Sequence, residues 1–256
     1  MKLRISDRMS KPDFQGDFTS AILKAAASPD VISFAGGLPN PDSFPVKEME
    51  AAVTKVLERD GVRALQYSNT EGYMPLRQFI SDRYKKQGVD FAPENIIITN
   101  GSQQALDMVA ATLINPGDTV AVEKPSYLAA LQTFHLYDPK IVSVSLNDDG
   151  IDCDELEKIL KENDPKFIYV IPNFQNPTGL TYTQAVRERA AEILKAAGTP
   201  VIEDNPYGEL RFHGEGGSSF AALLGEQCAA MGTFSKIVAP GMRIGWIACK
   251  QPELYA

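Results

Sequence analysis

The sequence predicts an α/β fold, a three-layer αβα sandwich around a mostly parallel sheet of seven strands. From about residue 95 onward, short apolar runs alternate with segments whose apolar residues recur at helical spacing. This alternation favours a parallel sheet, because each helix carries the chain back across one face of the sheet. The composition agrees, since 44% hydrophobic and 23% charged residues in a chain of 256 are ordinary values for a protein with a substantial core.

Seven apolar runs are predicted to be strands, because they are short and mostly separated by helical patterns. In chain order they are Asn95–Asn100, Thr119–Glu123, Ile141–Leu146, Phe167–Pro172, Val201–Asp204, Ala229–Thr233 and Arg243–Cys249. In sheets of this kind the crossovers are right-handed, and ligands bind at the carboxyl ends of the strands. We therefore expect functional side chains just after these runs.

Four helices are predicted between these strands. They cover Ser102–Ile114, Ser126–Tyr137, Asp152–Lys161 and Thr181–Ala197. Asp152 and Glu155 have the spacing of a capping box, and Thr181 with Gln184 is predicted to open the last helix in the same way. These helices complete the strand–helix units of the sandwich.

The first ninety or so residues do not follow this alternation. Val31–Asn40 is a short Gly/Pro-rich passage, and Val46–Arg59 and Pro75–Gln87 are predicted helices. We interpret residues 1–60 as an N-terminal arm with part of a smaller domain, and residues 61–256 as one large domain.

Charge, cysteine and hydropathy patterns argue against several functional classes. The net charge is −8, from 25 basic and 33 acidic residues without a basic block, so nucleic acid and anionic membrane surfaces are poor candidate partners. Cys153, Cys228 and Cys249 lack metal-ligand spacing, and only His135 and His213 accompany them, so no metal site is expected. Charged residues interrupt the N-terminus, and no run approaches the roughly 20 apolar residues of a membrane helix. These patterns predict a soluble, cytoplasmic protein.

A single lysine with hydroxyl neighbours lies in the turn between the last two predicted strands. Thr233-Phe234-Ser235-Lys236 precedes Pro240–Trp246, which contains Arg243. A lysine amine becomes nucleophilic when its surroundings lower its pKa, while hydroxyls and the planar guanidinium of arginine bind phosphate. The segment therefore suits a phosphorylated aldehyde held as a covalent imine on Lys236. The plain alternative is a surface lysine in a Ser/Gly loop.

A glycine turn joins the first predicted strand to the helix that follows it. Asn100-Gly101-Ser102-Gln103 ends the strand and begins the helix. Free backbone N–H groups at a helix N-terminus bind phosphate, and Gly101 lets the chain turn closely around such a group. Any strand-Gly-Ser-helix junction has this pattern, so a purely structural turn is the alternative.

Three other strand ends carry aromatic or polar groups. Tyr127 follows the second predicted strand and, taken alone, also suits a core position early in a helix. Asn176-Pro177-Thr178-Gly179 makes a rigid turn after the fourth strand, and the Asn176 amide can donate to a ligand oxygen. Asp204 ends the fifth strand, where a buried aspartate is costly unless it meets a cation. An acidic cap at the start of a loop is the alternative for Asp204.

These features occur in a fixed order: phosphate turn, aromatic, Asn-Pro-Thr-Gly, Asp-x-x-Tyr, Ser-Lys and Arg. In this order they resemble the class I/II pyridoxal-phosphate-dependent aminotransferases of fold-type I, which are aspartate aminotransferase-like. The resemblance covers nearly all of the chain, whereas the chain covers roughly the first two-thirds of a family member. It therefore implies a C-terminally truncated chain without the C-terminal small domain and its arginine for the substrate α-carboxylate.

By this resemblance the cofactor is pyridoxal 5'-phosphate, and the site residues follow position by position. The implied catalytic residues are Lys236, which forms the imine and moves the proton, Asp204, which keeps the pyridine nitrogen protonated, and Tyr127, which stacks on the ring. The implied cofactor-binding residues are Gly101, Ser102, Gln103, Tyr127, Asn176, Asp204, Tyr207, Thr233, Ser235, Lys236 and Arg243. Of these, Asn176 and Tyr207 are implied to contact the phenolic oxygen of the cofactor.

Two N-terminal segments concern the substrate and a second subunit. Gly36-Gly37-Leu38-Pro39 resembles the family's glycine loop near the substrate carboxylate, which makes Gly37, with Asn176, an implied substrate-binding residue. Gln66–Gly72 resembles the segment whose tyrosine, here Tyr67, reaches the phosphate of the neighbouring subunit. The resemblance thus implies a homodimer with shared active sites. A plain loop is the alternative for both segments.

The implied reaction is transfer of an amino group between an L-amino acid and a 2-oxo acid. The Gly-Gly-Leu-Pro and Asp204–Phe212 regions look most like enzymes for aromatic, branched-chain or 2-aminoadipate substrates. Three alternatives stay open. The chain can belong to another fold-type I reaction, such as a β-lyase or a decarboxylase. It can be a cofactor- or amino-acid-sensing domain, although no helix-turn-helix precedes Asp13. It can also be a non-catalytic fragment that binds pyridoxal phosphate.

Overall fold

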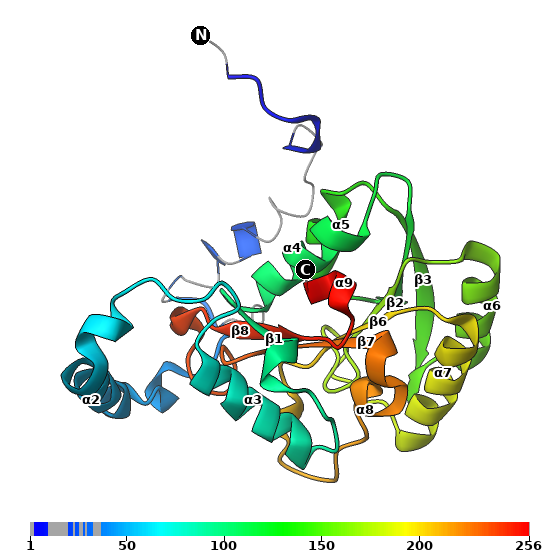
Figure 1. Ribbon diagram of the computed structural model, residues 1–256. Coiled ribbons are helices and arrows are strands. Elements are labelled where there is room, and N and C mark those ends of the chain that lie inside the picture. Colours follow the sequence, from blue (N-terminus) through cyan, green and yellow to red (C-terminus); the bar gives the residue numbers. More distant parts are fainter. Residues whose placement is uncertain are drawn as a thin grey trace.

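The structure, a computed structural model, describes residues 3–9, 20–22, 24–25, 28, 30–32 and 37–255. The described part contains a three-layer αβα sandwich, in which one mostly parallel sheet lies between two layers of helices (Figure 1). The predicted fold class is therefore confirmed. The predicted number of seven strands is wrong, because the sheet has eight strands in the described part of the chain.

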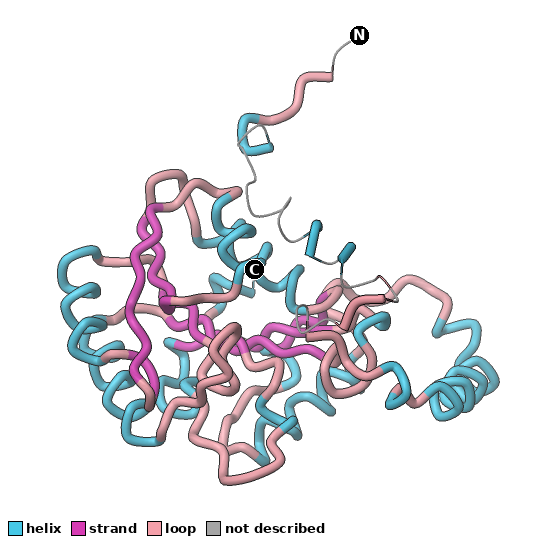
Figure 2. The backbone as a smooth tube through the Cα atoms, turned by 180° about the vertical axis from the view of Figure 1, so that it is seen from behind, coloured by secondary structure: helices cyan, strands magenta, loops and turns pink. Residues whose placement is uncertain are grey.

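The strands of this sheet have a mixed but mainly parallel arrangement. In chain order they are β1 (Ile96–Thr99), β2 (Thr119–Lys124), β3 (Lys140–Asn147), β4 (Gly150–Ile151), β5 (Ile168–Val170), β6 (Val201–Asp204), β7 (Cys228–Thr233) and β8 (Gly245–Ala248). Their order in space is β1-β8-β7-β6-β5-β2-β3-β4. Strands β7, β6, β5, β2 and β3 are parallel, whereas β8 runs antiparallel to both β1 and β7, and β4 runs antiparallel to β3. Seen from behind, they form one continuous twisted layer (Figure 2).

The additional strand, β4, is too short to be detected from sequence patterning. Its two residues pair with the end of β3, and Asp148 and Asp149 form the turn between them. Two residues show no alternation, so the available signal was the Asn-Asp-Asp-Gly cluster, whose residue types are typical of turns. Gly150 is required here, because its φ is +142° and an added Cβ would lie 2.7 Å from Val186 Cγ1.

Helices cover both faces of the sheet. They are α2 (Val46–Ala64), α3 (Met74–Lys86), α4 (Ser102–Leu113), α5 (Leu128–His135), α6 (Cys153–Asn163), α7 (Gln184–Ala197), α8 (Phe220–Leu224) and α9 (Pro252–Tyr255). The 3-10 helices are η1 (Asp7–Met9), η2 (Pro41–Ser43), η3 (Pro93–Asn95), η4 (Gly208–Leu210), η5 (Gly225–Gln227) and η6 (Pro240–Met242). On one face α4 and α5 pack through a cluster that includes Leu106 and Phe134, and on the other face α3, α6, α7 and α8 pack through a cluster that includes Ile80 and Leu194.

Helix α2 stands apart from the sandwich, at the left of Figure 1, and none of its side chains is buried. It runs across the predicted domain boundary at residue 60, where Asp60 has non-helical backbone angles (φ −130°, ψ 15°). The division into residues 1–60 and 61–256 stays a prediction.

Two of the predicted helix starts need correction. The predicted start at Thr181 is wrong: Thr183 is the N-cap of α7 and its hydroxyl accepts from the Val186 amide (3.4 Å). The Thr181 hydroxyl instead accepts from the Phe174 amide (3.1 Å), so it belongs to the turn after β5. Helix α5 likewise begins at Leu128, after the predicted Ser126 start, with Tyr127 as its N-cap.

Asp152 caps α6 as predicted, because its Oδ1 accepts from the amides of Asp154 (3.0 Å) and Glu155 (2.9 Å). The Glu155 carboxylate accepts from the Ser145 amide of β3 (2.7 Å) rather than from the Asp152 amide, so the predicted capping box is only half formed. The side chain of Glu155 therefore ties α6 to the sheet.

Candidate active site

A cavity of about 330 Å³ opens at the carboxyl ends of the parallel strands. Its lining residues are Ser102, Gln103, Tyr127, Ile171, Asn176, Asp204, Pro206, Tyr207, Thr233, Ser235, Lys236, Pro240 and Arg243. They come from the start of α4, the start of α5 and the ends of β5, β6 and β7 with the segments that follow. The lining contains every predicted cofactor-binding residue except Gly101 and Tyr67.

Lys236 follows β7 in a turn that aromatic packing anchors to the sheet. Phe234 packs on Trp246 of β8, with ring centroids 5.0 Å apart. The Lys236 ammonium donates to the Gly37 carbonyl oxygen (3.2 Å) and lies 6.0 Å from the centroid of the Tyr207 ring. Burial lowers the pKa of Lys236, because the charged form loses hydration. The amine is therefore closer to its neutral, nucleophilic form than an exposed lysine.

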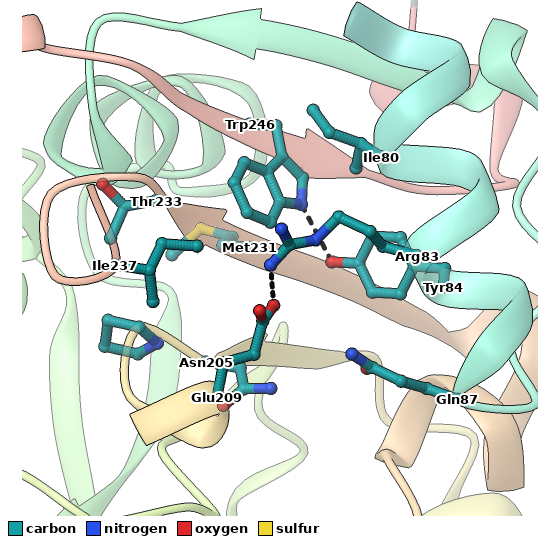
Figure 3. A pocket seen from close by; sticks show the side chains of 11 residues that line it. Ile80, Arg83, Tyr84, Gln87, Asn205, Glu209, Met231, Thr233, Ile237 and Trp246 are labelled. Carbon is teal, nitrogen blue, oxygen red and sulfur yellow. Dashed lines mark hydrogen bonds and ion pairs between the residues drawn. The ribbon is translucent and has the colours of Figure 1, made fainter. Parts of the chain in front are cut away.

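A second cavity, of about 30 Å³, lies behind this turn, between α3 and the sheet (Figure 3). Trp246 Nε1 donates to the Tyr84 hydroxyl (3.0 Å), and Arg83 of α3 forms an ion pair with Glu209 of η4. A space of this size has room for roughly one or two waters rather than for a ligand. These contacts therefore form the packing that supports the lysine turn from behind.

Asp204 ends β6 with its carboxylate buried beneath the cavity, where its side chain is 2% exposed. Oδ2 accepts from the Tyr169 hydroxyl (2.8 Å), whereas the buried Oδ1 has no hydrogen-bond partner among the described residues. Burial raises the pKa of Asp204 to about 6; the Tyr169 bond opposes this rise and the neighbouring Glu203 adds to it. A buried acceptor without a donor is costly, so Oδ1 is a place where a ligand donor or cation would be stabilised.

The start of α4 and Arg243 together form a positively polarised corner of the cavity. Arg243 Nη2 donates to the Asn100 carbonyl (3.3 Å) at the turn that begins the helix. Gly101 is needed at this turn, because its φ is +78° and an added Cβ would lie 2.5 Å from Arg243 Nη2. Thr233 and Ser235 bring hydroxyls to the same cavity and are joined by an Oγ1–Oγ hydrogen bond of 2.9 Å. A guanidinium, hydroxyls and free helix N–H groups suit a phosphate-sized anion.

The remaining wall carries an amide and two tyrosines. Asn176 Nδ2 donates to the Tyr207 hydroxyl (3.4 Å), so the two predicted partners of the phenolic oxygen are adjacent. Tyr127 packs in part against the α4–α5 side of the core and also lines the cavity, so the core and ligand interpretations are compatible. Burial is the main reason why the pKa of Tyr127 and that of Tyr207 are raised, which keeps both hydroxyls protonated.

Two predicted residues are placed differently from the rest. Tyr67, in the loop between α2 and α3, is fully exposed and outside the cavity. Gln103 lines the cavity, but its side-chain amide donates to the Thr133 hydroxyl of α5 (2.6 Å), which leaves its backbone at the start of α4 for a ligand. Gly37 lies beside Lys236, whereas its neighbour Gly36 lies outside the described residues.

Several residues of the site lie outside the sequence motifs and were not predicted. Ile171, Pro206 and Pro240 line the cavity, and the Tyr169 hydroxyl donates a hydrogen bond to Asp204. A signal for Tyr169 was available, because a hydroxyl in the middle of an apolar strand usually finds a hydrogen-bond partner when it is buried. Its partner was not predictable, since the two residues are 35 positions apart in the chain.

Comparisons with known proteins identify the family of this chain. The family described as "Aminotransferase class I and II" matches residues 29–255. The chain is 44% identical over 236 residues to aromatic-amino-acid aminotransferase 1 of Thermococcus litoralis, covering 90% of this chain and 57% of the relative. It is 40% identical over 236 residues to 2-aminoadipate transaminase of Thermus thermophilus, covering 91% of this chain and 58% of the relative. The crystal structure of Pyrococcus horikoshii kynurenine aminotransferase in complex with PMP has a TM-score of 0.90 at 38% identity, covering 98% of this chain and 63% of that one.

The chain thus spans somewhat less than two thirds of the length of these relatives, while the match extends over most of its own length. Fold, order of motifs and sequence identity agree with one another. The resemblance inferred from the motifs is confirmed, and the chain belongs to the aminotransferase class I and II family.

Proposed function

We propose that this chain provides the cofactor site of a pyridoxal-phosphate-dependent aminotransferase, which moves an amino group between an L-amino acid and a 2-oxo acid. The observation that carries the proposal is one cavity lined by a half-buried lysine amine, an aspartate oxygen without a partner among the described residues, and an arginine beside a helix N-terminus. These three groups match the three reactive or charged parts of pyridoxal phosphate: the aldehyde, the pyridine nitrogen and the phosphate.

The residues present fit this cofactor in chemistry and in size. Asp204 Oδ1, which lacks a donor among the described residues, would accept from the pyridine N–H. Ser102, Ser235, Thr233 and Arg243 would hold the phosphate, with the backbone N–H groups of Ser102 and Gln103. The Gly101 amide already donates to the Thr99 carbonyl (2.9 Å), so Gly101 would contribute through the turn that it allows. Tyr127 would lie on the ring, and Asn176 with Tyr207 would donate to the phenolic oxygen. The cavity of about 330 Å³ lies within the usual range for small-molecule sites.

When bound, the cofactor supplies an electron sink for the carbanion that forms at the substrate α-carbon. The chain's own residues supply the rest. The Lys236 amine forms the covalent link, and its lowered pKa favours the neutral form that this requires. When its amine is free, Lys236 Nζ would take the proton from the substrate α-carbon as a general base and would deliver it, as a general acid, to the former aldehyde carbon of the cofactor. Asp204 would stay ionised beside the pyridine N–H, because a cationic partner lowers the pKa that burial raises.

The substrate class is part of the proposal. The relatives named above act on aromatic amino acids, 2-aminoadipate and kynurenine by their names, which favours aromatic or 2-aminoadipate substrates over the branched-chain alternative. A β-lyase or a decarboxylase of the same fold would give different products from the same amino acid. Product analysis for the 2-oxo acid, with and without release of ammonia or carbon dioxide, separates these reactions.

A second subunit is also proposed. The fully exposed Tyr67 ring is available to a neighbouring chain, which supports a homodimer in which Tyr67 reaches the other subunit's phosphate site. No helix in the described part of the chain is long and apolar enough to cross a membrane. A cytoplasmic location stays a prediction.

Titration of the purified chain with pyridoxal phosphate tests the proposal. We expect a new visible absorbance band and, after borohydride reduction, a pyridoxyl adduct on the peptide that contains Lys236. Lys236→Ala is the matched variant: it keeps the phosphate and ring contacts, so it should bind the cofactor without the band and without the adduct. An adduct that maps mainly to surface lysines, with Lys236 unmodified, would contradict the proposed site.

A further inference from the structure

A buried polar cluster lies beneath the cavity and has no role in the proposed chemistry. Its centre is Glu123, near the end of β2, and its second member is Gln175, in the turn after β5. Both side chains are 1% exposed. Buried polar side chains of this kind are costly unless they are fully hydrogen-bonded, so their partners indicate what the cluster holds in place.

The Gln175 side-chain amide uses all of its hydrogen-bonding capacity. Nε2 donates to Glu123 Oε2 (2.9 Å) and to the Pro125 carbonyl (2.8 Å). Oε1 accepts from the Thr178 amide (3.0 Å) and from the Thr178 hydroxyl (2.7 Å). A primary amide has two donor hydrogens and two acceptor lone pairs, so no position is left for water or a ligand.

These bonds join two loops that are far apart in the sequence. Pro125 is two residues before Tyr127, and Gln175 directly precedes Asn176. Thr178, on the other side of Asn176, is bonded to the same amide, so Asn176 lies inside a closed hydrogen-bonded turn. One side chain therefore holds the backbone next to both Tyr127 and Asn176, which line the cavity.

Glu123 fixes this amide to the sheet. Its Oε1 accepts from the Ile171 amide (3.0 Å) and from the Tyr182 hydroxyl (2.6 Å), while Oε2 accepts from Gln175. Burial raises the pKa of Glu123 to about 7, against the effect of these donors. With or without the proton, an acceptor oxygen remains available to the Gln175 amide.

We propose that Gln175 is a positioning residue: its amide, held by Glu123, sets the places of Tyr127 and Asn176 in the cavity wall together. The consequence for the cofactor rests on the proposed function, whereas the mechanical link between the two loops does not. A residue that only added stability would leave the two loops independent of each other.

Hydrogen exchange of the ligand-free chain, followed by mass spectrometry, tests the mechanical link. The amides of Ala130 and Leu131 donate to the Tyr127 carbonyl (3.1 Å each) and so report on the first turn of α5. In Gln175→Leu, we expect these amides to exchange roughly tenfold faster, although position 175 is about 45 residues away in the sequence, because the Pro125 carbonyl loses its donor. Exchange at the wild-type rate in peptides that contain the start of α5 would overturn the proposal.

Tyr182→Phe is the matched control. It removes a hydrogen bond to the same Glu123 carboxylate, but the Tyr182 hydroxyl bonds neither the Pro125 loop nor the turn of Asn176. We expect the variant to be destabilised as a whole while the start of α5 keeps its wild-type exchange relative to the other helices. Equal acceleration at α5 in both variants would mean that general loss of stability is the cause, and would also overturn the proposal.

Pyridoxal phosphate binding tests the consequence for the site. For Gln175→Leu we expect roughly tenfold weaker binding than for wild type, and for Tyr182→Phe a change of less than about twofold. The pH midpoint of the visible band should move upward in Gln175→Leu, because a misplaced Asn176 no longer stabilises the anionic phenolic oxygen. Asn176→Ala should move it in the same direction, and the double variant should move it no further.

The outcomes separate the two proposals. If the wild-type chain forms no adduct on Lys236, the proposed function fails, and hydrogen exchange still decides the link between the loops. If wild type binds and Gln175→Leu keeps both its affinity and its pH midpoint, the positioning role fails while the proposed function stands.

Discussion

Two buried carboxylates flank β5 at the carboxyl edge of the sheet, and they differ in the number of hydrogen bonds that they accept. Glu123 of β2 and Asp204 of β6 are 1% and 2% exposed, and burial raises the pKa of both. Glu123 accepts from three donors, whereas Asp204 accepts from Tyr169 alone and leaves Oδ1 without a partner among the described residues. A satisfied carboxylate holds the scaffold together, and a half-satisfied carboxylate faces the cavity.

One edge of the sheet thus provides both a rigid scaffold and a group that is open to a ligand. The network on Glu123 joins β2, β5 and the following turn, so its bonds are made before any ligand binds. The unpartnered Asp204 oxygen instead costs free energy in the ligand-free protein, and a ligand donor would recover it. Stability and binding are thus divided between two similar groups.

The largest expected effect follows from removing the satisfied carboxylate. Glu123→Leu leaves the Ile171 amide, one of the two Gln175 Nε2 hydrogens and the Tyr182 hydroxyl without an acceptor inside the protein. We expect the free energy of unfolding at pH 4, where both carboxyls are largely protonated in the folded chain, to fall by about 3 kcal/mol or more, measured by urea denaturation. The matched variant is Asp204→Leu, which leaves only the Tyr169 hydroxyl without an acceptor. At the same pH it should lower the free energy of unfolding by about 1 kcal/mol. Equal losses in the two variants would remove the distinction between the carboxylates.

The sequence predicted the unsatisfied carboxylate but not the satisfied one, for a physical reason. Asp204 and Lys236 belong to local motifs whose order along the chain is visible without a structure. The bonds of Glu123 join residues about fifty positions apart, and they form because the parallel register places Val122 of β2 beside Tyr169 of β5. Local motifs can be recognised in the sequence, whereas hydrogen bonds between strands can be predicted only when the register of the sheet is known.

The elements of the fold also differ in how far local sequence determines them. Strands and helices with several apolar residues were predictable, because burial imposes a periodic pattern on them. Strand β4 has two residues, and the start of α7 depends on which of two nearby threonines bonds to the helix. Thr181 and Thr183 differ only in their surroundings in the folded chain, which sequence spacing does not contain.

An intermediate effect is expected when Asp204 is made neutral. The folded pKa of about 6 lies above the usual 3.8, so this carboxyl destabilises the protein increasingly as pH rises from about 3.8 to 6, by about 3 kcal/mol at most. Asp204→Asn removes the charge but places a buried NH2 near the vacant position, which costs about 1 kcal/mol. We therefore expect a net gain of about 2 kcal/mol in the ligand-free chain at pH 7, and no gain below pH 4.

The same substitution should weaken the cofactor site. Without the anion, pyridoxal phosphate affinity should fall at least about tenfold, because the pyridine N–H loses a charged acceptor. Urea denaturation between pH 4 and pH 8, together with cofactor titration, measures both effects. A variant that loses stability at pH 7 would contradict the view that ionised Asp204 is a cost in the ligand-free state.

The smallest effect is expected when the tyrosine hydroxyl that donates to each carboxylate is removed. Tyr169→Phe removes the hydroxyl that donates to Asp204, and Tyr182→Phe makes the same chemical change beside Glu123. Both side chains are fully buried or nearly so, with exposed fractions of 0% and 1%. The two losses of packing are therefore matched.

Asp204 then has no protein donor among the described residues, while Glu123 keeps two. The Tyr169 bond lowers the pKa of Asp204, so its loss should raise that pKa further above about 6. We expect Tyr169→Phe to cost about 1 kcal/mol of unfolding free energy at pH 8 and less at pH 5, where Asp204 is largely protonated in the folded chain. For Tyr182→Phe the difference between pH 5 and pH 8 should be smaller, because the Ile171 and Gln175 donors still stabilise the charge on Glu123. If both variants show the same pH dependence, the number of remaining donors does not determine the pKa of these carboxylates. Access to the cavity would then be the one difference between Asp204 and Glu123.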